Sequence, residues 1–351
     1  MNEYSSVFID WRLQTLPRHE IGNWSILRNG REINYPSCAE ALSALSKWQP
    51  GQNVYAASPS NNKYLTPIQI DEFYVPLKHA ARRQAWLGII LLAVVSVVML
   101  VFTVIHPSKA TVGFVLAMLI ATVIRWYDSF ISMNSANAVA DRALFFAWLR
   151  NEKRIRNIFI ASFIFLVAIG CAQLVLQLNQ TLAEVVSIYG ASYIKLRNFE
   201  LWRLISGPFF HGSLLHFASN AIYFISVAPI ALFYFRMWAF AAFFVANAVG
   251  AELQMLFGTN AFDAYLGISP GIFCLAILVS VPNAFGINLL PKGIPSIFIA
   301  IVAISLISAE AVAKNSATIA HLAGIGVGSF FAIVWILITS HTRLPKATRT
   351  L

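Results

Sequence analysis

Long apolar segments separated by short polar stretches dominate the chain from residue 85 onward. About 20 apolar residues suffice to cross a bilayer as a helix, so each segment is expected to span or enter a membrane. The segments lie at residues 85–105, 110–127, 157–177, 212–234, 238–257, 269–281, 294–309 and 318–340. The pattern predicts an all-α, polytopic membrane protein.

The first 80 residues are more polar and alternate differently. Asn29-Gly30 lies between two alternating runs, which is a strong hairpin signal because this turn needs a positive φ twice. Ser37 and Glu40 form a capping box before an amphipathic helix. Two further runs predict short strands, SVFIDW and NVYAAS. We predict a small soluble α/β domain over residues 1–80, without a catalytic constellation of its own.

Composition supports the membrane assignment and orients the chain. The sequence is 58% hydrophobic and 11% charged, with a formal net charge of +10. In a membrane protein this excess favours basic cytoplasmic loops over nucleic-acid binding. Basic residues gather in the N-terminal domain, in residues 131–156 and in the C-terminal tail, so we expect both termini in the cytoplasm. No signal peptide or organelle-targeting segment is visible, which makes a bacterial inner membrane the expected location.

The domain plan follows from these segments. We expect a soluble domain over 1–80, an extra transmembrane hairpin over 84–130, a basic cytoplasmic linker over 131–156 and a core of six apolar segments over 157–341. The segment 178–208 is too polar and interrupted to span, so it predicts a long loop at the membrane interface. Three scattered cysteines suggest neither a disulfide framework nor a zinc site, and we expect no metal and no cofactor.

One polar stretch, Trp202 to Asn220, lies among the apolar segments. It contains Arg203, His211, His216 and Asn220. His216 and Asn220 are four residues apart and share one helix face. Polar groups at membrane depth are costly and normally point into a protein interior or a wet cavity.

The helix that begins near Ser269 is too short to span the bilayer, so we expect it to begin inside the membrane. Ser269 followed by Pro270 is explained by helix capping alone, since Ser is a preferred N-cap and Pro suits the first helical position. Alternatively, Ser269 is a nucleophile at a helix N-terminus, where free N–H groups favour developing negative charge.

The last apolar segment carries a histidine and a packing motif. Gly324 and Gly328 form GxxxG, which lets two membrane helices approach closely. His321 lies one turn earlier, so a helix that touches the glycines passes near its imidazole.

Together these motifs resemble the rhomboid family of intramembrane serine proteases. The matching residues, in the family's order, are Trp202-Arg203, the array His211, His216 and Asn220, then Gly267-x-Ser269, and His321 with Gly324 and Gly328. The resemblance implies a six-helix core over residues 157–340. It also implies transmembrane protein substrates and an enzyme embedded in the lipid bilayer.

The resemblance also implies roles for single residues. Ser269 would be the nucleophile and His321 the general base of a dyad. His216, Asn220 and the backbone N–H of Ser269 would form the oxyanion hole. Phe273 would pack on the His321 ring, His211 would support the site, and Trp202-Arg203 would stabilise the interfacial loop. Gly267 belongs to the serine motif. His321 must be neutral to accept a proton, so activity is expected to fall below pH about 6.5 if the histidine is unperturbed.

Two departures from the family pattern and three alternatives accompany this interpretation. Pro270 stands where the family more often has glycine, and the acidic residue usual at the end of the second core helix is missing. An inactive rhomboid-like protein that binds membrane clients would usually lack the serine or the histidine. A channel or transporter would explain buried polar residues but not the Ser-Pro helix start. A metal-dependent protease would need a motif such as HExxH, which is absent.

Overall fold

The computed structural model describes residues 16–341 except 19, 49–51, 53, 107–108, 135, 259–263 and 313–316. The chain divides into two compact units. One consists of the residues up to 156 together with 290–300, and the other of residues 157–289 and those from 301 on. The strand predicted for SVFIDW lies outside the described residues, as does the basic C-terminal tail.

The N-terminal region folds into small sheets against a short helix. Strands β2 (Trp24–Arg28), β3 (Arg31–Tyr35) and β4 (Val54–Ala57) form an antiparallel sheet in the order β3-β2-β4. Asn29 and Gly30 both adopt positive φ, 52° and 81°, which confirms the predicted hairpin turn. Strands β1 (Leu16–Pro17) and β5 (Lys63–Tyr64) pair separately.

Helix α1 (Cys38–Ala44) starts where the capping box places it, because Ser37 Oγ accepts the N–H of Glu40. It packs with the sheet around a compact core. That core joins these residues to the short 3₁₀ helix η3 (Pro67–Gln69) and to the first turns of the next helix; its members are Ile26, Ala41, Leu45, Trp48, Val54, Ala56, Ile68, Ile70, Phe73 and Leu77.

Helix α2 (Asp71–Ile105) begins well before residue 85, where the apolar pattern placed its start. The predicted start of this helix at residue 85 is therefore wrong. Phe73 and Leu77, in the first turns of α2, are buried in the core of the N-terminal region, and Asp71 and Glu72 favour a helix N-terminus. One continuous helix thus leads from that core into the apolar segment.

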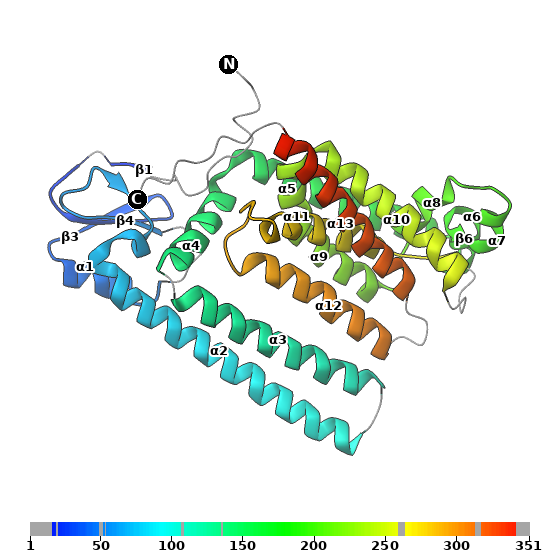
Figure 1. Cartoon of the computed structure of the whole chain (residues 1–351), viewed down its shortest axis with the longest axis horizontal. Helices are drawn as coiled ribbons and strands as arrows, with labels where there is room; N and C mark the ends of the chain where they lie inside the picture. Colours follow the sequence, from blue (N-terminus) through cyan, green and yellow to red (C-terminus); the bar gives the residue numbers. More distant parts are fainter. Residues whose placement is uncertain are drawn as a thin grey trace. The chain divides into compact units, whose positions relative to one another are not determined.

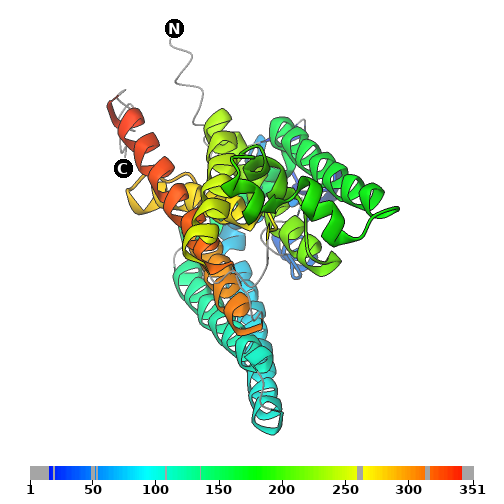
Figure 2. The same cartoon turned by 90° about the vertical axis from the view of Figure 1, so that its right-hand side faces the viewer.

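Helix α3 (Lys109–Asn134) returns beside α2, and Figures 1 and 2 show the two running side by side. Many apolar side chains of α2 are exposed, which suits a surface covered by lipid. Helix α4 (Ala136–Asn151) follows, and its Phe145 and Trp148 are buried. Helix α5 (Lys153–Gln177) comes next.

The segment from 178 to 213 is more ordered than a loop. It contains the helices α6 (Leu182–Tyr189), α7 (Tyr193–Arg197) and α8 (Arg203–Ser206) and the 3₁₀ turn η4 (Gly207–Phe209). Strand β6 (Ala191–Ser192) pairs with β7 (Ala264–Tyr265), close before Ser269. Sequence pattern missed this pairing because each strand has only two residues.

Helix α11 (Ser269–Ala284) is surrounded by three other helices. They are α9 (Leu214–Phe235), α10 (Met237–Phe257) and α13 (Thr318–His341). Most residues of α11 are buried. A helix that is apolar on every side is stable only inside such a bundle. Helix α12 (Ile294–Val312) lies between α11 and α13 in sequence.

Four helices in the described part of the chain are long and apolar enough to cross a membrane. They are Lys153–Gln177, His216–Phe235, Met237–Phe257 and Thr318–Thr339. Ile89–Ile105, Ser269–Ala284 and Ile294–Leu306 are shorter apolar helices. The eight crossings and the cytoplasmic termini stay predictions.

Candidate active site

The N-terminal half of α13 lies directly on α11. A Cβ atom at Gly324 would clash with the carbonyl oxygen of Pro270, and one at Gly328 would lie 2.5 Å from the carbonyl oxygen of Cys274. Glycines four residues apart therefore face backbone one turn apart on the partner helix. This contact brings the turn before Gly324, which carries His321, to the start of α11.

Ser269 and His321 meet at this contact. The Oγ atom of Ser269 lies 2.8 Å from Nε2 of His321, and the serine is only 7% exposed. Ser269 is the first residue of α11, whereas Ile268 occupies the N-cap position and makes no side-chain cap bond. The alternative that Ser269 serves as an N-cap is therefore wrong, because its hydroxyl is directed to the imidazole.

The imidazole of His321 is oriented by packing. The ring of Phe273, one turn after Ser269, lies 4.8 Å from the His321 ring between centroids, with the planes tilted by 35°. The buried Nδ1 atom of His321 has no hydrogen-bond partner among the described residues. Among the described residues the pair therefore has no third polar group of the kind that orients the histidine in a triad, and the aromatic ring packs on the imidazole face instead.

Helix α9 brings two polar side chains to the same place. Ser213 caps α9 by accepting the N–H of His216, which fixes the start of the helix. One turn apart, His216 and Asn220 both face Gly267. A Cβ at Gly267 would lie 2.9 Å from His216 Nε2 and 3.4 Å from Asn220 Nδ2.

Among the described residues, the side-chain amide of Asn220 leaves a hydrogen-bond donor free beside the backbone of Gly267, two residues before Ser269. Gly267 has φ 105°, a conformation that favours glycine, and its neighbours leave no room for a side chain. Asn220 is 5% exposed, yet its Nδ2 has no hydrogen-bond partner in the described structure. A buried N–H donor without a partner is costly, so this donor is available for an acceptor from outside the chain.

His211 lies at the entry to α9 and is fixed by α5. The side-chain amide of Gln173 donates to the carbonyl of His211 at 2.8 Å and accepts its N–H at 3.0 Å. The Nδ1 atom of His211 lies 3.0 Å from the carbonyl oxygen of Phe209, and the ring contacts that of His216 at 5.1 Å. Burial lowers the pKa of His211 to about 4, so the neutral ring donates from Nδ1 to Phe209.

Trp202 and Arg203 make their contacts within the loop segment. Arg203 is 4% exposed and binds Glu200 through both Nε and Nη2 at 2.8 Å. Its Nη1 donates to the carbonyl of Gly190 at 3.0 Å. The half-exposed Trp202 ring stacks on the guanidinium at 4.5 Å. The Arg203 hydrogen bond is the largest cause that lowers the pKa of Glu200.

Three residues that secure the site were not identified from the sequence. Asn247 of α10 accepts the N–H of Gly271 at 3.2 Å, and Gln254 accepts that of Ala320 at 3.2 Å. Both amides supply partners that the N-termini of α11 and α13 lack internally. Tyr265 donates to the carbonyl of Gly267 at 2.9 Å. A side-chain amide within an apolar helix is the sequence feature that could have identified Asn247 and Gln254. Gln173 in α5 has the same feature.

The part of the chain that contains Ser269 and His321 matches a known protein family. Residues 198–339 match the family model described as the Rhomboid domain. The match begins after α5, so the six-helix core predicted from residue 157 stays a prediction. A search of curated proteins found no match.

Proposed function

The chain contains a rhomboid domain over residues 198–339, and from this premise we propose that it is an intramembrane serine endopeptidase. The observation that carries the proposal is the 2.8 Å contact between Ser269 Oγ and His321 Nε2. A hydroxyl at this distance from an imidazole nitrogen can transfer its proton as it attacks a carbonyl carbon.

In the proposed first step, Ser269 Oγ attacks the scissile carbonyl and His321 Nε2 takes the hydroxyl proton. Collapse of the tetrahedral intermediate breaks the C–N bond, and His321 gives the proton to the leaving amine. Water then attacks the acyl-enzyme, again with His321 as base, and releases the carboxyl product and free Ser269. The proposed reaction uses no cofactor and no metal.

Charge that develops on the carbonyl oxygen needs donors. The free Nδ2 of Asn220 and the ring of His216 lie beside Gly267, two residues before the nucleophile. The N–H of Ser269 is in the first turn of α11, where backbone N–H groups lack intrahelical partners. These three groups support an oxyanion hole at the positive end of the α11 dipole.

We propose single-pass transmembrane proteins as substrates. A peptide must present extended backbone to the buried Ser269, so segments with small residues and weak helical propensity are the expected cut sites. The long apolar helices support an integral membrane location. The basic clusters support cytoplasmic termini. We propose a bacterial inner membrane as the location.

Purified protein mixed with a single-pass substrate in proteoliposomes tests the proposal. We expect cleavage within or next to the transmembrane segment, located by mass spectrometry of both fragments. Ser269→Ala should abolish it, and Ser226→Ala, an exposed serine on α9, should not. Absence of cleavage by the wild type across several substrates would favour an inactive, client-binding rhomboid.

A further inference from the structure

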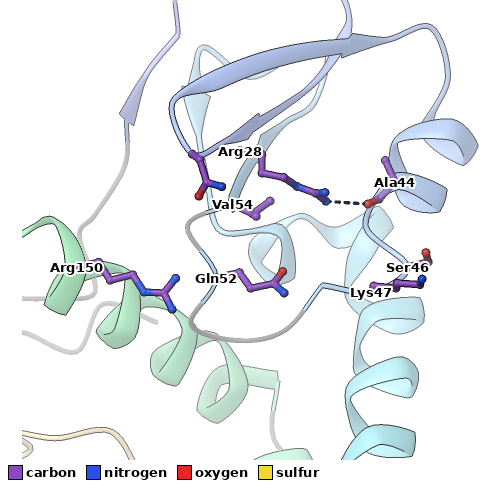
Figure 3. Close-up of a pocket in the computed structure, with 8 residues that line it drawn as sticks. Arg28, Ala44, Ser46, Lys47, Gln52, Val54 and Arg150 are labelled. Atoms are coloured by element: carbon purple, nitrogen blue, oxygen red, sulfur yellow. Dashed lines mark hydrogen bonds between the residues drawn. The ribbon is translucent and has the colours of Figure 1, made fainter. Parts of the chain in front are cut away.

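A hollow of about 390 Å³ lies in the unit that contains the N-terminal region, and none of its lining residues belongs to the proposed active site. We call it the basic hollow; it is lined by Arg28, Asn29, Ala44, Ser46, Lys47, Gln52, Val54 and Arg150. Figure 3 shows Arg28 and Lys47 on one side and Arg150 on a separate helix. The volume is in the range of about 300–1,000 Å³ that small-ligand pockets occupy.

The charged side chains that line the basic hollow are all positive. Among the described residues, three cations from separate segments line it, at the end of β2, just after α1 and in the last turn of α4, and no carboxylate does. None of the three forms an ion pair with another described residue. Converging like charges repel one another, and an anion between them relieves that repulsion.

The groups present suit phosphate. Arg28 is held in place, since its Nη2 donates to the carbonyl of Ala44 at 3.0 Å, and its other N–H groups remain to bind a ligand. A guanidinium offers paired donors to phosphate oxygens and an ammonium adds a point charge. Ser46 adds a hydroxyl on the same rim.

The position along the chain favours a lipid. Arg150 comes three residues before Lys153, where the span Lys153–Gln177 begins. Three residues of chain reach at most about 11 Å, so Arg150 lies close to the level at which that helix enters the bilayer. Basic pockets at this level bind anionic head groups.

We propose that the basic hollow binds a phosphate-bearing anion and that the headgroup of an anionic phospholipid is its source. The site is separate from the proposed proteolysis and does not depend on it. Binding is electrostatic, so it weakens as salt concentration rises.

Native mass spectrometry of the full-length protein in detergent tests the proposal. Phosphatidylglycerol is titrated against zwitterionic phosphatidylcholine, and glycerol 3-phosphate forms the soluble arm. Lys47→Gln and Arg150→Gln, both exposed and outside any core, should each weaken phosphatidylglycerol binding about fivefold, and together about 30-fold. Thermal melting of each variant checks that it folds.

Lys63→Gln is the matched control, because Lys63 is an exposed lysine of the same unit that does not line the basic hollow. It should leave binding unchanged. Glycerol 3-phosphate bound as tightly as the lipid, with the same dependence on Lys47 and Arg150, would support the site with a soluble phosphate as its source. Equal binding by wild type and the double variant in both arms, or an equal loss in Lys63→Gln, would overturn the proposal.

Discussion

Gly324 of α13 faces the carbonyl of Pro270 in α11 with no room for a methyl group between the two helices. His321 lies one turn before this glycine and Ser269 one residue before the proline. The glycine contact therefore sets the distance between the two side chains of the dyad.

Gly324→Ala should force α13 away from α11. Overpacking of this kind costs about 1–3 kcal/mol and should lower the melting temperature and cleavage activity together. Gly326→Ala is the matched control, because a Cβ there meets nothing within 4 Å. Thermal unfolding and cleavage rates of both variants would show whether only the first is impaired; equal behaviour would contradict the packing role.

Asn220→Ala removes the proposed oxyanion donor and leaves the dyad in place. Loss of one such donor should slow cleavage roughly a hundredfold or more, mainly in kcat. The Nδ2 atom has no partner in the described structure, so its loss should cost little stability. Ser226→Ala, on the same helix, is the comparison, and an unchanged kcat in Asn220→Ala would remove Asn220 from the oxyanion hole.

Gln173→Ala breaks both hydrogen bonds between α5 and the backbone of His211. The groups left unpaired should cost about 1–3 kcal/mol and loosen the entry to α9. We expect lower thermal stability and faster hydrogen exchange around residue 211. Gln177→Ala changes the same residue type one turn later and should have little effect. Matching losses in both variants would argue against a specific clamp.

The sequence indicated the residues that meet at the candidate site better than the residues that hold them in place. Ser269, His321 and the two glycines could be placed because short spacings on apolar helices restrict which faces meet. From the sequence alone, a capping role for Ser269 could not be distinguished from the proposed nucleophilic role, since both favour serine at a helix start. Only the hydrogen bond to His321 decides where the hydroxyl points.

The features that the sequence did not predict depend on contacts between residues far apart in the chain. The β6–β7 pairing joins segments more than 70 residues apart, Ala191 with Tyr265, through two-residue strands with no periodicity to detect. The early start of α2 depends on burial of Phe73 in a core formed by distant residues. The anchoring amides, such as Asn247, depend on which helix end each one meets.

Acid should destabilise the protein through His211. Its pKa falls from an ordinary 6.5 to about 4 on folding, so the unfolded chain binds the proton more tightly. Stability is therefore full above pH 6.5 and lost as pH falls toward 4, by about 2 kcal/mol at pH 5. Melting temperatures between pH 8 and 5 should fall less steeply in His211→Gln than in wild type. The exposed His79→Gln should keep the wild-type slope; a slope unchanged in His211→Gln would contradict the prediction.

The most direct test of the dyad needs no knowledge of the natural substrate. A fluorophosphonate reacts with a serine whose proton a neighbouring base accepts: the Oγ–P bond forms, fluoride leaves and the proton passes to the base. Intact mass and peptide mapping should find one adduct on Ser269 in the wild type and in Ser280→Ala, a second buried serine of α11. Labelling should be lost in Ser269→Ala and strongly reduced in His321→Ala. An unlabelled Ser269 in folded wild-type protein, or labelling that is undiminished in His321→Ala, would contradict a nucleophile activated by His321.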